Sequence, residues 1–339
     1  MSSLETFDAV VVGGGPAGAT AAGDLAKMGH KVLLLDRAGR IKPCGGAIPP
    51  RLIKDFEIPD ELLVAKARSA RMISPKNNQV DIPIDGGFVG MVDRDKFDEW
   101  LRVRAANDGA TRRTGIFEKI TRDTDGTAIL HYRIHSSNRP EDDQKGAVRA
   151  KAIIGADGAK SGVGRNAIPG AKDVDYVFAY HEIVRVPDVL PQGYDGSRCD
   201  VFYQGHLSPD FYGWVFPHGD TMSVGTGSAD KGFSLRSAVG RLRDAAGLQH
   251  ATVLRREGGF IDYFQLLFDS HQIIYAEGIA AETMLVDTRT RAALPPELAE
   301  KLAQSLPGHT NRPHLQFEVP DDLLNRPDAA ELLRRASTR

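Results

Sequence analysis

The fold is decided by Asp8-Ala-Val-Val-Val-Gly-Gly-Gly-Pro-Ala-Gly-Ala-Thr20 together with Lys31-Val-Leu-Leu-Leu-Asp-Arg37. The apolar run Ala9–Val12 is short enough for a buried parallel strand, and it leads directly into a glycine-rich turn. Small residues from 17 to 28 then predict a helix, and a second apolar run ends in Asp36. This order of elements predicts a βαβ unit.

The glycines of this turn follow the spacing Gly13-x-Gly15-x-x-Gly18, and each has a physical role. Gly13 permits the tight turn, Gly15 lets a pyrophosphate approach the backbone, and Gly18 lets the helix lie close to the sheet. Phosphates would then meet the free N–H groups at the helix N-terminus. Asp36 would accept hydrogen bonds from an adenosine ribose. The alternative is a glycine-rich turn without a ligand, but the complete order of strand, turn, helix, strand and acid favours dinucleotide binding.

The composition is that of an ordinary soluble globular protein. The 339 residues are 41% hydrophobic and 26% charged, which allows about two domains, each with its own core. The net charge of −2 gives no general attraction to nucleic acid or to an anionic membrane. No run of about 18 apolar residues and no signal-peptide pattern is present, so we predict a cytoplasmic location. Two cysteines, Cys44 and Cys199, are too few for a disulfide framework or a thiolate metal site, and we predict no metal.

Three further segments carry candidate chemistry. Residues 42–50, Lys-Pro-Cys-Gly-Gly-Ala-Ile-Pro-Pro, predict a loop whose backbone can lie flush against a flat group, although a plain loop remains the alternative. Asp93 is a plausible N-cap of a helix whose first turn contains Arg94, and an arginine there calls for an anion or acceptor; a surface salt bridge is the other interpretation. Asp157, between Gly155 and Gly158 after a buried strand, can bind a hydroxyl-bearing ligand or form a simple Asp-Gly turn.

An antiparallel region is predicted between residues 176 and 229. Strands are expected at 177–186, 199–203, 211–216 and 221–226, and a hairpin at 68–84. Most of the aromatic residues gather here, and such a cluster is either a core face or the lining of a long apolar pocket. Because strand residues alternate, Trp214 and a neighbour must face opposite sides.

The predicted fold class is α/β, with a Rossmann-type nucleotide domain, an inserted antiparallel substrate domain and a helical tail. We assign residues 1–66 and 92–172 to the first domain, 67–91 and 173–263 to the second, and 264–339 to a divergent C-terminal segment. Within that segment, residues 296–306 and 328–335 have the apolar spacing of amphipathic helices.

Four motifs together resemble those of geranylgeranyl reductases: Val12-Gly-Gly-Gly-Pro-Ala-Gly-Ala-Thr20, Lys42-Pro-Cys-Gly-Gly-Ala-Ile-Pro-Pro50, Ile154-Gly-Ala-Asp-Gly-Ala-Lys-Ser161 and Tyr212-Gly-Trp-Val-Phe-Pro217. The resemblance covers residues 5 to about 262 and is greatest to the branch acting on geranylgeranyl diphosphate and geranylgeranyl-bacteriochlorophyllide in photosynthetic bacteria. It implies an FAD-binding fold of the aromatic-hydroxylase type, with NADPH as the electron donor and reduction of three of the four double bonds to give a phytyl chain.

The resemblance also implies roles for individual residues. The implied FAD-binding residues are Gly13, Gly15, Ala17, Gly18, Asp36, Arg37, Cys44, Gly45, Gly46, Ala47, Arg94, Asp157 and Gly158. Those implied to line the prenyl channel are Tyr212, Trp214, Phe216 and Pro217. Because an isolated C=C bond needs a hydride on one carbon and a proton on the other, Cys44 and Tyr212 are the candidate catalytic residues for proton supply.

The expected partner is a prenyl diphosphate or a prenylated bacteriochlorophyll, with no nucleic acid. Burial of so apolar a chain contributes about 25 cal/mol per Å², and contact with the photosynthetic membrane is compatible with such a substrate. The sequence gives no indication of the oligomeric state.

The chain departs from the family pattern after Glu257-Gly-Gly-Phe260, where the family motif Gly-Asp-Ala-Ala-Gly is missing. That motif places a carboxylate on the ribityl chain, so we expect weaker flavin binding. Two alternatives therefore stand beside the reductase: an FAD-dependent aromatic monooxygenase, and a non-catalytic nucleotide-binding remnant that binds partners through residues 264–339.

Overall fold

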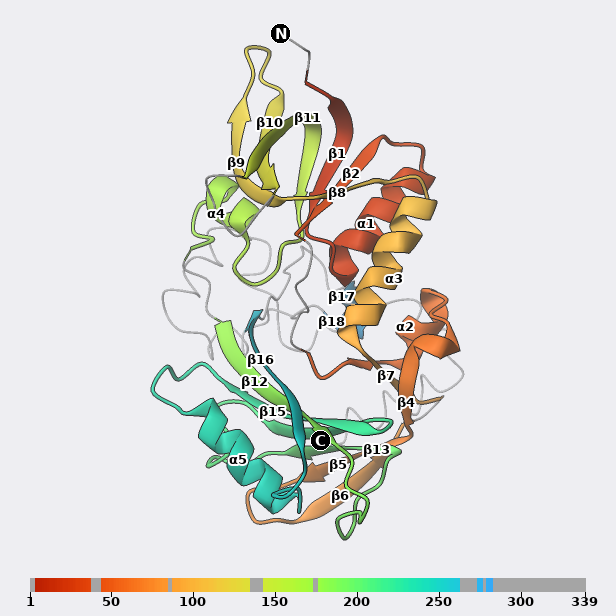
Figure 1. The fold of residues 1–339 in the computed structure, drawn as a ribbon, viewed down its shortest axis with the longest axis vertical. Helices are drawn as coiled ribbons and strands as arrows, with labels where there is room; N and C mark the ends of the chain where they lie inside the picture. Colours follow the sequence, from red (N-terminus) through yellow and green to blue (C-terminus); the bar gives the residue numbers. More distant parts are fainter. Residues whose placement is uncertain are drawn as a thin grey trace, which may run out of the picture. The chain divides into compact units, whose positions relative to one another are not determined.

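The computed structural model describes residues 4–37, 44–84, 87–134, 143–172, 176–262, 273–276 and 279–282 (Figure 1). It divides the chain into two units, Met1–Asp262 and Tyr263–Arg339. Of the second unit, only a hairpin of β17 (Ile273–Ala276) and β18 (Ile279–Glu282) is described. The two helices predicted at 296–306 and 328–335 lie outside the described residues, as do residues 42 and 43 of the cysteine loop.

The first sheet contains the predicted βαβ unit. Strand β1 (Thr6–Val12) pairs in parallel with β2 (Val32–Asp36) and with β11 (Gln144–Gly155). The six strands have the order β8-β2-β1-β11-β10-β9. The remaining strands are β8 (Thr111–Thr114), which is parallel to β2, and the antiparallel pair β9 (Ile116–Arg122) and β10 (Ala128–Ile134). The prediction of an α/β nucleotide-type domain is therefore confirmed.

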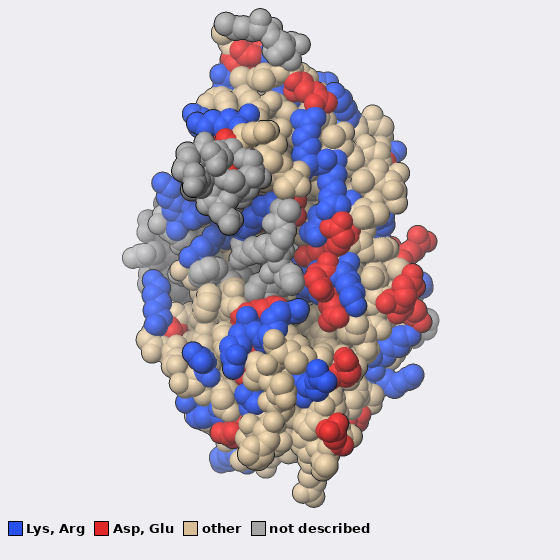
Figure 2. Space-filling view, in the orientation of Figure 1, with Lys and Arg blue, Asp and Glu red and all other residues tan. Residues whose placement is uncertain are grey.

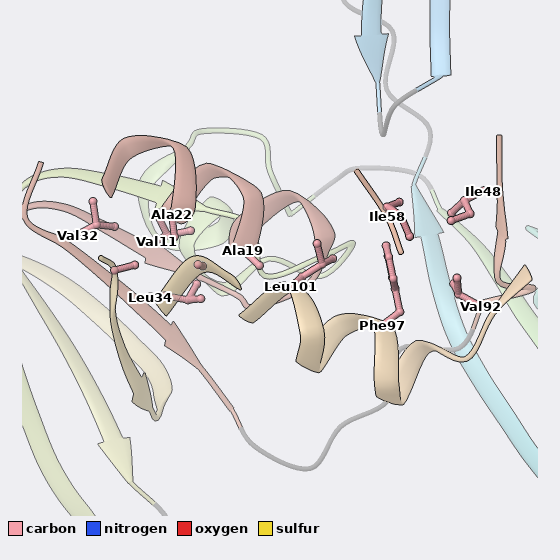
Figure 3. Close-up of a cluster of buried hydrophobic side chains, with 12 residues drawn as sticks. Val11, Ala19, Ala22, Val32, Leu34, Ile48, Ile58, Val92, Phe97 and Leu101 are labelled. Carbon is pink, nitrogen blue, oxygen red and sulfur yellow. The ribbon is translucent and has the colours of Figure 1, made fainter. Parts of the chain in front are cut away.

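Two helices, α1 (Pro16–Lys27) and α3 (Arg94–Asn107), cover one face of this sheet. Their small and apolar residues, such as Ala19, Ala22 and Leu101, pack against Val11 and Leu34 of the strands (Figure 3). On the opposite face, Phe7, Val10 and Leu33 pack with residues of β10, β11 and the short helix α4 (Gly162–Ala167). The alternation along β1 and β2 thus buries both faces, as expected for parallel strands.

A small sheet follows the cysteine loop and was not predicted as a sheet. It has the order β3-β7-β4, from Ala47–Ile48, Val89–Val92 and Leu63–Ala67, and it is joined by α2 (Pro50–Asp55) and a 3₁₀ turn, η1 (Asp60–Leu62). The edge strand β3 follows the cysteine loop, and the central strand β7, which pairs with β3, leads into the start of α3.

The predicted antiparallel region forms a seven-stranded sheet of order β16-β12-β15-β14-β13-β5-β6. The strands are β5 (Ser69–Ile73), β6 (Gln79–Pro83), β12 (Tyr176–Arg185), β13 (Arg198–Phe202), β14 (Gly213–His218), β15 (Thr221–Ser228) and β16 (Val253–Asp262). The strand predicted at 211–216 therefore begins two residues later than expected. All neighbours are antiparallel except β13 and β5.

One side of this sheet, here called the helix face, is covered by α5 (Leu235–Ala245). Val215, Met222 and Val224 pack there with Val239 and Leu242 of the helix. Ser234 caps α5, because its side chain accepts a hydrogen bond from the N–H of Ser237. The other side, the aromatic face, carries Trp214 and Phe216 and the residues paired with them. The predicted alternation of Trp214 with its neighbour is confirmed.

In the part of the chain that the structure describes, no helix is long and apolar enough to cross a membrane. On the face drawn in Figure 2, basic and acidic side chains lie interspersed, in keeping with the net charge of −2. The region between the two large sheets is where the glycine turn, the cysteine loop and the start of α3 lie, and the candidate site is built from them.

Candidate functional site

The glycine turn connects β1 to α1 by close backbone contacts. Gly13 has a φ of +104°, and a Cβ on it would lie 2.2 Å from the carbonyl oxygen of Ala156. A Cβ on Gly18 would lie 1.9 Å from the carbonyl oxygen of Gly13, so the helix could not approach the turn with any larger residue. By contrast, a Cβ on Gly15 would have no atom of the described residues within 4 Å. The turn is therefore packed on the protein side and open at Gly15, where a pyrophosphate would approach.

An arginine that the sequence analysis did not single out joins this turn to Asp36. Arg102 of α3 donates from Nη1 to the carbonyl oxygen of Gly14 at 3.1 Å and lies 3.3 Å from Oδ2 of Asp36. Gly14 must be small, because a Cβ there would lie 2.7 Å from Cδ of Arg102. Asp36 itself is only partly buried, at the carboxyl end of β2. The Arg102 guanidinium thus holds this carboxylate beside the turn.

These residues fit the ADP half of a dinucleotide. Helix α1 begins at Pro16, and no side chain caps its N-terminus, so the first N–H groups of the helix are free for an anion. Ala17 and Arg37 are exposed at the same end of the sheet. The open space at Gly15, the uncapped helix and the partly buried Asp36 are the features that an adenosine pyrophosphate requires.

The cysteine loop lies against the aromatic face. A Cβ on Gly45 would be 3.0 Å from Cδ2 of Phe216 and 3.5 Å from Nε1 of Trp214, so the loop backbone sits directly on these two rings. Cys44 is exposed, and its Sγ accepts a hydrogen bond from the N–H of Gly46 at 3.4 Å. Gly46 has a φ of +73°, and Ala47, exposed, begins β3. At Gly45 the loop backbone is thus in contact with aromatic rings of the sheet.

A second missed residue, His218, ties this loop to the sheet. Nε2 of His218 lies 2.9 Å from the carbonyl oxygen of Gly45, and Nδ1 lies 3.5 Å from Oδ1 of Asp93. The hydrogen bond with His218 holds the pKa of Asp93 below its usual range. The Asp93 side chain makes no capping hydrogen bond to α3, so the predicted N-cap is wrong in that respect. The carboxylate is instead directed at the histidine.

Arg94, the next residue, has found its acceptor within its own helix. Nε and Nη2 of Arg94 each donate to Asp98 at 2.8 Å, and both side chains are buried. The surface salt bridge offered as the alternative is wrong, because this pair is buried. Burial opposes the positive charge, but the bond to Asp98 and the neighbouring Cys44 side chain raise the pKa of Arg94 above its usual value. The buried ion pair of Arg94 and Asp98 thus lies beside the cysteine loop.

Asp157 serves its own loop. Its Oδ2 accepts hydrogen bonds from the N–H groups of Gly162 at 2.6 Å and Val163 at 3.2 Å, and its Oδ1 accepts one from the Ser161 hydroxyl. The carboxylate therefore caps α4. Gly158 has a φ of +87°, which matches the Asp-Gly turn that was the alternative interpretation. This turn also lies next to Gly13 through Ala156, so it shapes the glycine turn from behind.

The aromatic residues form a continuous ladder along the aromatic face. Ring centroids are 6.1 Å apart from Tyr203 to Tyr212, 6.1 Å from Tyr212 to Trp214 and 6.3 Å from Trp214 to Phe216. At the Phe216 end, the rings join a core with Cys199 and the small sheet. At the other end, Tyr203 is 48% exposed. The ladder is thus part of a core at its Phe216 end and open to solvent at its Tyr203 end. The structure does not bring Pro217 to it, because Pro217 alternates to the helix face.

Comparison with known proteins completes the description. The pyridine nucleotide-disulphide oxidoreductase family matches residues 7–186. The chain is 52% identical to a geranylgeranyl diphosphate reductase of Rhodobacter capsulatus over 81% of this chain and 68% of that protein. It is 39% identical to the chloroplastic geranylgeranyl diphosphate reductase of Oryza sativa, covering 73% of this chain but only 55% of the plant protein.

Solved structures agree. A geranylgeranyl bacteriochlorophyll reductase-like protein of Thermoplasma acidophilum superposes with a TM-score of 0.66 at 25% identity, over 78% of this chain and 68% of that one. A flavin-dependent brominase superposes with a TM-score of 0.59 at 17% identity, over 75% of this chain and 67% of the brominase, and shows the fold alone.

Proposed function

Because the chain belongs to the geranylgeranyl reductase family, within the flavoprotein oxidoreductases, we propose that it hydrogenates C=C bonds of a geranylgeranyl chain with FAD as cofactor and NADPH as electron donor. We propose geranylgeranyl diphosphate or geranylgeranyl-bacteriochlorophyllide as the substrate, in bacteriochlorophyll synthesis. The observation that carries the proposal is the contact of the cysteine loop with the aromatic ladder. At Gly45, a backbone that can face a flat ring lies directly on Trp214 and Phe216, which can face an apolar chain.

The glycine turn and the cysteine loop would bind different parts of the cofactor. The glycine turn, with Gly15 open and Asp36 held by Arg102, would bind the ADP portion of FAD. The cysteine loop would lie along the flavin ring, with the Arg94–Asp98 ion pair beside the loop. The bound cofactor, once reduced, supplies the hydride.

The protein's own residues orient the substrate and supply the proton. The Tyr203 end of the ladder is open and offers an apolar surface, and burying an isoprenoid chain on it would contribute about 25 cal/mol per Å². We propose that the proton comes from Tyr212 or Cys44, which lie on the two sides of the contact at Trp214 and Gly45. We further propose that so apolar a substrate is taken up at a membrane surface.

The test is anaerobic incubation of the full chain with FAD, NADPH and geranylgeranyl diphosphate, followed by mass analysis. We expect products heavier by successive pairs of hydrogens. Oxygen consumption with NADPH and an aromatic substrate, without prenyl reduction, would instead support a monooxygenase. A colourless protein that cannot be reconstituted with FAD would support a non-catalytic remnant.

The matched variant is Gly15→Val. A Cβ at Gly15 would meet no described protein atom within 4 Å, so we expect the substitution to leave the fold intact and to fill the space where the pyrophosphate would approach. We expect unchanged thermal stability and at least tenfold weaker FAD binding, measured by flavin fluorescence quenching. Gly240→Ala, at an equally open but distant position in α5, should leave FAD binding unchanged.

A further inference from the structure

A chain of buried polar groups lies on the aromatic face beside Trp214. Nε1 of Trp214 donates to Oγ of Ser223 at 3.0 Å, and Oγ of Ser223 lies 2.9 Å from Nδ1 of His181. Nε2 of His181 lies 2.9 Å from Oε2 of Glu257, whose other oxygen pairs with Arg255. Ser223 is fully buried and His181 is 2% exposed. These four side chains come from four neighbouring strands, β14, β15, β12 and β16.

The strand register brings the groups into line. Trp214 is paired with Gly225, Gly225 with His181, and His181 with Glu257, so all four positions share one face. The indole lies over the backbone of β15, because a Cβ on Gly225 would be 2.2 Å from Cζ2 of Trp214 and 2.5 Å from Cβ of His181. The His181 and Trp214 rings are 6.2 Å apart. A glycine at this position is what allows the indole to reach Ser223.

The donors and acceptors fit only one direction along the chain. An indole N–H can only donate, so Ser223 accepts from Trp214 and has one hydroxyl proton left to give. The only described partner for that proton is Nδ1 of His181, so Nε2 of His181 carries the hydrogen and donates to the Glu257 carboxylate. Every link is then satisfied, and the carboxylate fixes the histidine tautomer. Burial is the largest single influence and disfavours the Glu257 charge, but the hydrogen bond with His181 and the neighbouring Arg255 together outweigh it and hold the pKa of Glu257 below its usual value.

Packing alone does not account for this arrangement. A buried histidine and carboxylate are costly unless each has a defined partner, and an apolar row would close the sheet equally well. The row of hydrogen-bonded side chains fixes the orientation of the Trp214 ring. Nε1 of Trp214 also lies 3.5 Å from the position of a Cβ on Gly45. Trp214 is thus held from one side by the polar chain and meets the cysteine loop on the other.

We propose that Glu257, His181 and Ser223 are positioning residues that fix the indole of Trp214 against the cysteine loop. Resting on the proposed function, this makes them determinants of how the isoprenoid chain lies relative to the flavin. With its orientation fixed, the Trp214 ring presents the same surface to the isoprenoid chain while that chain shifts between successive reductions. None of the three residues needs to touch the substrate.

The experiment uses Trp214 as its own reporter. The chain has only two tryptophans, so Trp100→Phe leaves Trp214 as the single fluorescent indole. In that background we compare Ser223→Ala with Ser228→Ala, a buried serine at the far end of the same strand that bonds to Asp210. We expect Ser223→Ala to raise the acrylamide quenching of Trp214 at least twofold and to reduce its near-UV circular dichroism, while Ser228→Ala changes neither. If Ser223→Ala does not fold, His181→Gln carries the same expectation.

A conservative variant separates positioning from general damage. Glu257→Gln keeps an oxygen that can accept from His181, so the Trp214 signals should stay near those of the parent, whereas Glu257→Met should behave like Ser223→Ala. Equal effects of Gln and Met, or unchanged Trp214 signals in Ser223→Ala, would overturn the proposal.

The kinetic measurement tests the functional half. We expect Ser223→Ala to lower kcat about tenfold and to leave more partly reduced prenyl product, with KM for NADPH unchanged. An altered Trp214 signal with unaltered kcat and product pattern would refute the link to turnover. If the parent protein reduces no prenyl chain, the proposed function fails, while the fluorescence measurement still decides whether the three residues hold the ring.

Discussion

The two faces of the seven-stranded sheet are made by the same strands but are stabilised by different interactions. On the helix face, Val215, Met222 and Val224 close an apolar core with Leu242 of α5. On the aromatic face, the residues between them are Trp214, Ser223 and Gly225, with His181 and Glu257 in the same row. On the helix face, apolar side chains pack closely to fill the space. On the aromatic face, directed hydrogen bonds fix the side chains, and Gly225 leaves room for the Trp214 ring.

This difference shows what distinguishes a wall of a site from a core. Core side chains can exchange shapes as long as the volume is kept, so their identities are loosely constrained. A ring held by a hydrogen bond over a glycine depends on each partner, because an unpaired buried polar group is costly. Substitutions on the helix face should therefore change stability, and substitutions on the aromatic face should change geometry.

The largest expected effect lies on the helix face. Leu242 of α5 is fully buried against the strands that this helix covers. Leu242→Ala should therefore lower the free energy of unfolding by about 2–5 kcal/mol. Tyr203→Ala, at the exposed end of the ladder, should lower it by less than about 1 kcal/mol. Urea unfolding followed by far-UV circular dichroism measures both. Similar losses for the two variants would remove the distinction between the faces.

A smaller effect is expected from a single methyl group on the aromatic face. Gly225→Ala places a Cβ 2.2 Å from the Trp214 ring, so the indole must move and unfolding should become easier by about 1–3 kcal/mol. The same change at Gly240, exposed within α5, meets no atom within 4 Å and should stabilise the helix by up to about 1 kcal/mol. Thermal unfolding checks the opposite signs, and Trp214 fluorescence checks the displacement. An unmoved indole in Gly225→Ala would contradict the packing described.

The contact at the edge of the aromatic face should depend on pH. His218 lowers the pKa of Asp93 from its ordinary 3.8, so the stabilisation from Asp93 is complete above that value and is lost as the pH falls through the lower pKa of the folded state. Lys96 and Arg255 add smaller favourable charges. Asp93→Asn should cost under about 1 kcal/mol at neutral pH, since the side chain is 36% exposed and partly screened.

This cost should disappear in strong acid, where the carboxylate of the parent is also protonated. Urea unfolding across the acid range measures it, with Asp95→Asn, exposed in the same helix turn, as the control for charge at the helix terminus. A difference between parent and Asp93→Asn that grows as the pH falls would contradict the assignment.

The smallest change, alkylation without substitution, tests where the aromatic face is closed. Cys199 lies on this face but is covered by Ala67 and Met91 of the small sheet. Burial, helped by Asp200, raises the pKa of the Cys199 thiol to about 12, whereas Cys44 is exposed. Iodoacetamide at mildly alkaline pH should therefore label Cys44 alone in the native protein and both cysteines in urea, as read by peptide mass mapping. Native labelling of Cys199 would show that this end of the face is open.

Local signals explain what was predictable from the sequence. The βαβ unit lies within one continuous stretch, so its strands, its turn and the need for Gly13 and Gly18 could be predicted correctly. The alternation around Trp214 followed equally from the period of a strand. Whether the aromatic cluster was core or surface could not be decided, because the answer differs along the ladder and depends on which residues the small sheet covers.

Long-range contacts explain what was missed. Arg102 lies far along the chain from Gly14 and Asp36, and no local pattern marks the contact. His218 is likewise not marked by any local pattern, because its ring bonds to Gly45 from a distant strand. At Asp93 and Asp157, the residue type was informative but the partner was not: one carboxylate bonds to a histidine instead of its own helix, and the other caps a helix that was not predicted.

The parallel pairing of β5 with β13 has a consequence for synthesis of the protein. The hairpin of β5 and β6 leaves the ribosome early, but the strand it must pair with follows only after the whole of the first sheet has been made. Until then, the edge of β5 that pairs with β13 stays unpaired. The nascent chain thus carries an unpaired strand edge while the residues between β5 and β13 are made, and slow translation between the two strands would lengthen the interval in which chaperones have to protect it.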